Sequence, residues 1–339
     1  MQEARLWKRL KGDTVQCRLC SHFCVIGQGE RGQCGVRENR EGTLMALNYG
    51  KIAAINLDPV EKKPLYHFHP GSRTYSFATA GCNLSCSFCQ NWSLSQPQRE
   101  GGRVTGRAMT PGDLVEEAVK LKAASISYTY SEPTIFFEIM QDTARLAADQ
   151  GLANIMVSNG FMSPECLDEL GPLIDAANVD LKSFSEDFYR DICGARLKPV
   201  LENLVRIRHD LGWWLEVTTL LIPGRNDSPG ELDRLTDFLV DELGEDTPWH
   251  ISRFHPDYRM NDVGATGTDT LEAAYAMGRD KGLKYVYIGN LPGSNRQHTL
   301  CPGCGATLID RVGFAPSAMG LKNGRCLRCG TPVAGVGLN

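Results

Sequence analysis

The 339-residue sequence lacks any apolar run of the roughly 18–20 residues that a membrane-spanning helix needs. Its first residues, Met1 to Lys8, are not followed by the continuous apolar stretch of a secretory signal. It also lacks a surplus of one charge, because 36 Lys and Arg stand against 40 Asp and Glu, for a net charge of −4. We therefore expect a cytoplasmic protein that has no membrane partner and is not a general polyanion binder.

The composition is that of an ordinary globular protein. Hydrophobic residues make up 42% and charged residues 22% of the chain, which excludes a disordered or fibrous protein. At roughly 100–200 residues per domain, the length allows two or three units.

Cysteine is the residue that the sequence has in excess, with 13 in the chain. Most of them are clustered, and in a reducing compartment clustered thiols indicate metal binding rather than disulfides. The three groups are Cys17, Cys20, Cys24 and Cys34; Cys82, Cys86 and Cys89; and Cys301, Cys304, Cys326 and Cys329.

Strand and helix patterns alternate between residues 72 and 291, which predicts a parallel sheet with helices outside it. The number of units favours an α/β fold with a partial or near-complete (β/α) barrel, whose active site lies at the C-terminal ends of the strands. The predicted domains are a Cys-rich N-terminal region (1–71), the barrel (72–293) and a small C-terminal module (294–339).

The central cysteines follow directly on the first strand of the predicted barrel, with the spacing C-x3-C-x2-C. Three thiolates in one short loop can hold three irons of a [4Fe–4S] cluster and leave the fourth iron open for a ligand. Cys82, Cys86 and Cys89 are therefore the predicted ligands of an open cluster, and Phe88 is expected to shield one of its faces.

This motif, Cys82-x3-Cys86-x-Phe88-Cys89, resembles the signature of the radical S-adenosylmethionine (SAM) superfamily. The resemblance implies that the open iron chelates the methionine part of SAM. It also implies that a reductant such as ferredoxin or flavodoxin drives cleavage to a 5′-deoxyadenosyl radical, which abstracts hydrogen from a protein or small-molecule substrate.

Polar residues at the later strand ends resemble those of pyruvate formate-lyase activating enzymes. They lie in Tyr-Ser-Glu-Pro, Ser-Asn-Gly, Asp-Leu-Lys and Phe-His-Pro segments. The resemblance implies that this set binds SAM: Glu132, Asn159, Asp180, Lys182 and His255.

The flanking cysteine groups make the whole chain resemble the AmmeMemoRadiSam system radical SAM family, in the activating-enzyme-like branch. Ser131 and Val157 depart from the activase pattern, which has Gly and Asp there. The leading hypothesis is an oxidoreductase-like radical SAM enzyme acting on an unidentified protein or small molecule. The alternatives are a glycyl-radical-enzyme activase and, in another class, a non-enzymatic iron–sulfur or zinc RNA-binding adaptor.

The C-terminal cysteines form two C-x2-C-G knuckles, at Cys301–Cys304 and Cys326–Cys329, which are typical of a zinc ribbon. Rubredoxin-like iron is the alternative metal. The module has a surplus of basic residues but no aromatic stacking platform, so we do not expect it to bind nucleic acid.

The N-terminal group, with the spacing C-x2-C-x3-C-x9-C, differs from the bacterial ferredoxin pattern. Zinc is the first interpretation, and an auxiliary iron–sulfur cluster or no metal are the others. His22 lies between Cys20 and Cys24 and could add a ligand.

Overall fold

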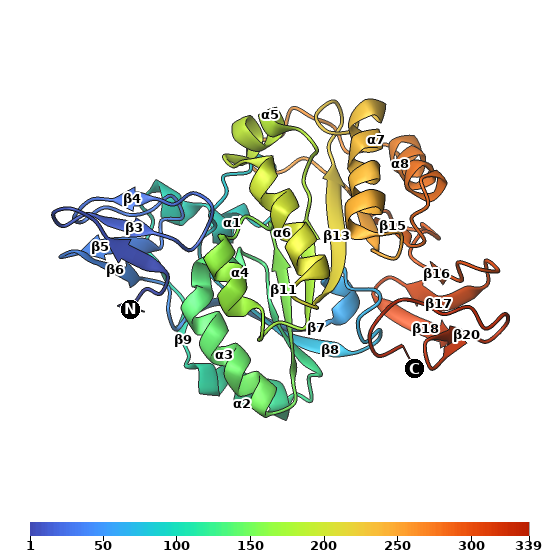
Figure 1. The fold of residues 1–339 in the computed structure, drawn as a ribbon, viewed down its shortest axis with the longest axis horizontal. Coiled ribbons are helices and arrows are strands. Elements are labelled where there is room, and N and C mark those ends of the chain that lie inside the picture. Colours follow the sequence, from blue (N-terminus) through green and yellow to red (C-terminus); the bar gives the residue numbers. More distant parts are fainter. Residues whose placement is uncertain (339) are drawn as a thin grey trace.

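The computed structural model describes residues 1–338, and the side chains of all of them except residues 317–319. Its centre is a nine-stranded sheet with the order β15-β14-β13-β12-β11-β10-β8-β7-β9, in which β8 and β10 to β15 run parallel. Because β15 and β9 are the two edges, the barrel is partial (Figure 1). The parallel strands are β8 (Arg73–Thr79), β10 (Ser125–Tyr128), β11 (Ala153–Ser158), β12 (Ala176–Asp180), β13 (Trp214–Leu221), β14 (Trp249–Arg253) and β15 (Val286–Gly289).

Two antiparallel strands extend this sheet. β7 (Lys51–Pro59) pairs with β8, and β9 (Arg107–Ala108) pairs with β7. β7 lies in the range expected for the N-terminal region, so the central sheet begins near residue 51 rather than 72. The segment after β7, including the short 3-10 helix η1 (Val60–Lys62), crosses to β12 and β13, where the Asn178 side chain donates to the Pro64 carbonyl at 2.8 Å.

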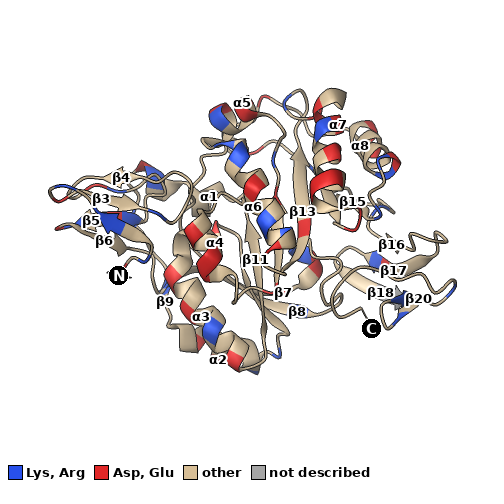
Figure 2. Cartoon of the chain, in the orientation of Figure 1, with Lys and Arg blue, Asp and Glu red and all other residues tan. Residues whose placement is uncertain are grey.

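Helices follow most of the parallel strands and cover the outer face of the sheet (Figure 1). Two of these helices begin with side-chain caps: Thr110 and Asp113 form a capping box, and the Ser163 side chain accepts from the Cys166 backbone. Lys, Arg, Asp and Glu mark the outward helix faces (Figure 2). The helices are α1 (Trp92–Ser95), α2 (Pro111–Lys120), α3 (Phe137–Asp149), α4 (Pro164–Leu170), α5 (Glu186–Phe188), α6 (Leu197–His209), α7 (Pro229–Phe238) and α8 (Thr268–Asp280).

The N-terminal region docks on the barrel through a buried ion pair. The Arg37 guanidinium donates to both carboxylate oxygens of Glu138 on α3 at 2.7 Å, and both side chains are 1% exposed. Because the pair joins the two parts of the chain, it fixes where the first cysteine group lies. The small sheets here are β1 (Gln2–Glu3), β6 (Thr43–Ala46) and β5 (Arg37–Arg40), and β2 (Trp7–Arg9), β3 (Val15–Cys17) and β4 (Val25–Ile26).

The C-terminal module packs on the barrel rather than standing apart from it. Its buried Leu308, Ile309 and Leu321 share one apolar cluster with Tyr66, Tyr285 and Tyr287 of the barrel, while Val312 and Phe314 are exposed. No helix among the described residues is both long and apolar enough to cross a membrane. The module's strands are β16 (Thr299–Leu300), β17 (Thr307–Val312), β18 (Ala315–Met319), β19 (Leu321–Lys322) and β20 (Arg325–Cys326).

Candidate active site

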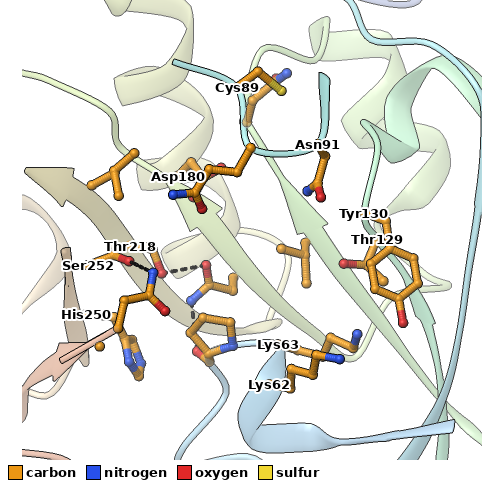
Figure 3. Close-up of a pocket in the computed structure, with 18 of the residues that line it drawn as sticks. Lys62, Lys63, Cys89, Asn91, Thr129, Tyr130, Asp180, Thr218, His250 and Ser252 are labelled. Atoms are coloured by element: carbon orange, nitrogen blue, oxygen red, sulfur yellow. Dashed lines mark hydrogen bonds between the residues drawn. The ribbon is translucent and has the colours of Figure 1, made fainter. Parts of the chain in front are cut away.

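One cavity of about 940 Å³ lies inside the partial barrel. Figure 3 shows Cys89 at one end of it and Lys62, Lys63 and His250 at the other. The cavity is lined by all three central cysteines and all five residues that the sequence marked for SAM: Cys82, Cys86, Cys89, Glu132, Asn159, Asp180, Lys182 and His255.

The cysteine loop between β8 and α1 is shaped by close backbone packing. Gly81 has φ +112°, and a Cβ there would lie 2.8 Å from Val36 Cγ1, so only glycine fits. The Leu84 N–H donates to Cys82 Sγ at 3.4 Å, and the Ser95 hydroxyl lies 3.3 Å from Cys89 Sγ. These contacts hold the thiols in place and suit sulfur atoms that carry negative charge.

Glu132 accepts four hydrogen bonds from its own chain. Its carboxylate accepts from the Thr134 backbone (3.0 Å) and hydroxyl (2.6 Å), the Ser158 hydroxyl (2.8 Å) and the Asn159 backbone (2.8 Å). Burial nevertheless raises the pKa of this carboxyl. Oε2 accepts only one of these bonds, so it retains capacity for one further donor.

Asn159 joins the end of β11 to the cysteine loop. Its Nδ2 donates to Asn83 Oδ1 at 2.8 Å and lies 3.8 Å from Cys82 Sγ, while its Oδ1 accepts from the Phe161 backbone at 3.0 Å. The side chain therefore positions a thiol as well as lining the cavity.

Asp180 and Lys182 form an ion pair at 2.9 Å, and the Lys182 side chain is 14% exposed. Desolvation lowers the pKa of Lys182, but Asp180, Cys86 and Cys193 together outweigh it, and the net shift is upward. His255 lies at the rim, where its ring contacts Gln90 Nε2 at 3.0 Å. The pair thus reaches the cavity from the end of β12, and the histidine reaches it from the end of β14.

Sequence reasoning missed a second polar group at the far end of the cavity. Lys63 is 2% exposed, donates to Asp58 at 2.6 Å and lies 4.4 Å from the centre of the Tyr130 ring. Burial lowers the pKa of Lys63 to about 8. Burial raises the pKa of Asp58, but hydrogen bonds from Lys63 and Tyr130 outweigh this and hold it at about 2. Tyr130, two residues after β10, has φ +65°, a backbone conformation that no local sequence motif predicts.

A buried histidine–carboxylate pair adjoins this end. His250 Nε2 lies 2.6 Å from Glu216, which also accepts from the Tyr66 and His67 backbones at 3.0 and 2.7 Å. Nearby, Thr218 donates to Asn178 at 2.8 Å and Asn290 donates to Ser252 at 2.9 Å (Figure 3). Asn178, Thr218, His250 and Ser252 stand on strands in ordinary alternation and Asn290 directly follows β15, so only the topology shows that these five residues line one cavity.

Cys193 supplies a further thiol beside the cysteine loop. A hydrogen bond from Cys193 lowers the pKa of the Cys86 thiol, more than burial raises it. The Ser85 N–H donates to the Cys193 carbonyl at 2.9 Å, and a Cβ on Gly194 would lie 2.3 Å from Ser85 Oγ. Its sequence position, alone and before a glycine, gave no signal of this contact.

The two flanking cysteine groups lie outside the large cavity. In the C-terminal module, all four sulfur atoms lie within 4.8 Å of one another. The N-terminal cysteines and His22 instead line a small buried cavity on the other side of the cysteine loop.

Comparison with known proteins shows which family and which relatives this chain resembles. The profile of the Radical SAM superfamily matches residues 77–236. An uncharacterized protein of Methanocaldococcus jannaschii is 44% identical over 336 residues, covering 98% of this chain and 99% of the relative. The pyruvate formate-lyase 1-activating enzyme of Escherichia coli K12 is 22% identical over 237 residues, covering 64% of this chain and 93% of the relative.

A solved structure shares the fold. A radical SAM methyltransferase from Sphaerobacter thermophilus superposes with a TM-score of 0.51 and 17% identity, over 65% of this chain and 67% of the other. This superposition shows that the fold of the central sheet is shared with a known protein.

Proposed function

Because this chain belongs to the radical SAM superfamily and is thus an enzyme, we propose that Cys82, Cys86 and Cys89 hold a [4Fe–4S] cluster that binds SAM on its open iron. When bound, the cluster supplies the electron that cleaves SAM to a 5′-deoxyadenosyl radical, which takes hydrogen from the substrate. The observation that carries the proposal is that one cavity joins the three thiols to the five polar residues.

The donor set fits such a cluster. Three thiols converge on the cavity, and among the described side chains no fourth cysteine lines it. Three thiolates and one open position are what a substrate-binding cluster requires. The buried Phe88 ring, whose centre lies 5.8 Å from Lys182 Nζ, covers one side of the loop and excludes water.

The remaining residues have distinct tasks in this proposal. Lys182 is a donor for a carboxylate, Asp180 and the free position of Glu132 are acceptors for an ammonium group, and His255 contacts the cofactor from the rim. Asn159 holds Cys82 in place.

The cavity also has room for the substrate. Its volume of about 940 Å³ is at the upper end of the roughly 300–1,000 Å³ of small-molecule pockets. Lys63, His250 and the paired amides and hydroxyls at the far end favour a polar small molecule or an inserted polar side chain. A ferredoxin- or flavodoxin-type protein would supply the electron.

Glycyl-radical-enzyme activation is the second candidate, because an activating enzyme matches over 93% of its own length. Electron paramagnetic resonance of a glycyl-radical enzyme from the same organism, incubated with this protein and SAM, tests it. Membership of an enzyme superfamily counts against the third hypothesis, a non-enzymatic RNA-binding adaptor.

The direct test is SAM cleavage. Protein reconstituted with iron and sulfide under anaerobic conditions, then reduced with dithionite, should release 5′-deoxyadenosine from SAM, measured by liquid chromatography. A fully loaded cluster that binds SAM yet releases no 5′-deoxyadenosine would contradict the proposal.

Lys182→Met should weaken SAM binding. Losing a hydrogen bond to a charged group costs about 1.5–3 kcal/mol, so Kd should rise about tenfold or more. Titration calorimetry on the reconstituted protein measures this, and the iron content shows that the cluster is intact. Lys198→Met is the matched control, because that side chain is 78% exposed on α6. An unchanged Kd would remove Lys182 from the SAM site.

We further propose that the C-terminal quartet holds structural zinc. Sulfur atoms at about 2.3 Å from a tetrahedral ion lie about 3.8 Å apart. Here the Cys301–Cys329 and Cys304–Cys326 sulfur distances are 3.5 and 3.8 Å. Four protein ligands close the coordination sphere, which is typical of a structural site.

Cys304→Ser should release this zinc and loosen the tail. Metal binding is coupled to folding in small modules, and the buried large apolar side chains of the tail are few: Leu308, Ile309, Leu321, Val333 and Leu338. Elemental analysis should show zinc lost and iron retained, and limited proteolysis should cut the tail. A protease-resistant tail without zinc would mean that packing on the barrel alone folds it, and joint loss of zinc and iron would mean one cooperative unit.

A further inference from the structure

Charged residues line the large cavity in two separate sets. The first set belongs to the proposed SAM site and consists of Glu132, Asp180 and Lys182. The second set lies on η1 and directly after it, and consists of Glu61, Lys62 and Lys63. Figure 3 shows Lys62 and Lys63 at the end of the cavity away from Cys89. Because SAM engages the first set, the second set remains for the substrate.

The one acid of the second set is not open to a ligand. Glu61 Oε1 accepts from the Gly71 N–H at 2.8 Å, and Arg311 Nε lies 4.0 Å from the same oxygen. The Glu61 and Arg311 side chains are both 0% exposed, so a molecule in the cavity cannot reach this carboxylate. Arg311 also matches its charge, so Glu61 does not offset the charge of the two lysines.

The two lysines share a single counter-ion. Lys63 Nζ donates to one carboxylate oxygen of Asp58 at 2.6 Å, and Lys62 Nζ donates to the other at 3.0 Å. Among the residues that the structure describes, no other carboxylate lies within ion-pair distance of either ammonium group. Two positive charges therefore face one negative charge, which leaves a surplus of one positive charge.

The two ammonium groups differ in access. The Lys62 side chain is 45% exposed, so a bound molecule can contact it directly. The Lys63 side chain is 2% exposed, and its ammonium packs against the Tyr130 ring, 4.4 Å from the ring centre. Lys63 therefore acts through its charge at short range, in surroundings where charges are less screened than in water.

The other polar groups near this end are neutral or already paired. Thr218 donates to Asn178 at 2.8 Å. The Glu216 carboxylate is 0% exposed, accepts from two backbone N–H groups and faces His250 at 2.6 Å. The surplus charge of the two lysines is thus the main charge offered to a substrate here, and a cavity with a charge of one sign attracts the opposite sign.

We propose that Lys62 and Lys63 bind a carboxylate group of the substrate, which is a small carboxylic acid. Lys62 donates a hydrogen bond to the carboxylate, and Lys63 supplies the second charge from behind it. A singly charged carboxylate matches the surplus of one positive charge, whereas a phosphate dianion exceeds it. No arginine among the described residues lines the cavity, although arginine is the residue best suited to bidentate phosphate binding. The inference rests on the proposed function, because SAM at the cluster end is what leaves this end for the substrate.

A pair of fluorinated probes tests the charge of the ligand. Trifluorobutyrate and its neutral amide, trifluorobutyramide, have nearly the same size and differ in charge. Each is titrated into the reconstituted, oxidised protein with saturating SAM, and binding is followed by fluorine nuclear magnetic resonance. The acid should bind at least about tenfold more tightly than the amide, because the amide cannot accept a hydrogen bond with a negative charge. Equal binding of the two probes, or no binding of the acid, would overturn the proposal.

Substitution of Lys62 shows where the acid binds. Lys62→Met should weaken its binding about tenfold or more, whereas Lys62→Arg should retain most of the affinity. Because Asp58 keeps its hydrogen bond from Lys63, both variants should fold, which Tm and iron content check. Lys120→Met, in the exposed last turn of α2 and outside the cavity, is the matched control. An unchanged affinity in Lys62→Met would place the acid elsewhere and overturn the proposal.

Further outcomes distinguish this inference from its alternatives. Displacement of the bound acid by inorganic phosphate at a lower concentration than by butyrate would assign the site to a phosphate group and overturn the choice of a carboxylate. Binding of the acid that depends on Lys62, in a protein that releases no 5′-deoxyadenosine from SAM, would defeat the proposed function alone. Release of 5′-deoxyadenosine together with equal binding of acid and amide would defeat the carboxylate site alone.

Discussion

Replacing Cys82, Cys86 and Cys89 together with Ala is expected to abolish SAM cleavage. No other described cysteine lines the large cavity, so the triple variant lacks the three thiolates that would hold the iron to which SAM binds. The measurement is 5′-deoxyadenosine released after anaerobic reconstitution and reduction with dithionite. It should fall to the level of a sample without protein.

Cys166→Ala is the control for this variant. Cys166 is fully buried in α4 and does not line the cavity, so its loss should leave both cleavage and iron content in place. Cleavage that survived the triple substitution would show that the central cysteines are not the site of the chemistry.

Arg37→Met should destabilise the protein by about 3–5 kcal/mol, because it leaves the Glu138 carboxylate buried and without its cation. The Glu138 carboxylate would keep only the hydrogen bond from the Arg5 backbone N–H, at 2.7 Å. The substitution would therefore weaken the contact between the N-terminal region and α3. Thermal unfolding followed by circular dichroism measures the shift in Tm.

Two further variants make this result specific. Arg190→Met removes an exposed ion pair, with 64% and 79% exposed partners, and should leave Tm nearly unchanged. The double variant Arg37→Met/Glu138→Met removes both buried charges and should recover much of the loss. A double variant as unstable as the single one would show that packing, rather than the unpaired charge, causes the effect.

The barrel could be predicted from the sequence because its signals are local. The capped helix starts at Thr110 and Ser163 and the buried apolar strands between helices are readable within a dozen residues. β7 was placed outside the barrel because antiparallel pairing with β8 depends on the 59–73 connection, which no periodicity reveals.

The candidate site likewise has one part that the sequence predicts and one part that only the fold reveals. The cluster loop could be found because its three thiols lie within eight consecutive positions. Lys63 directly follows η1, Thr218 lies on β13 and His250 lies on β14, so each is an unremarkable polar residue until the fold brings them to one cavity. The sequence did not decide which metal, if any, the N-terminal quartet binds, because the spacing of cysteines along a chain does not fix the distances between their sulfur atoms.

The cavity is lined by residues from both the N-terminal and the C-terminal part of the sequence, such as Lys63 and Phe314. Proteins are synthesised from the N-terminus and their units fold in that order. The loop with Cys82 leaves the ribosome more than two hundred residues before Phe314. During this interval the cavity lacks the part of its wall that Gly313 and Phe314 later supply.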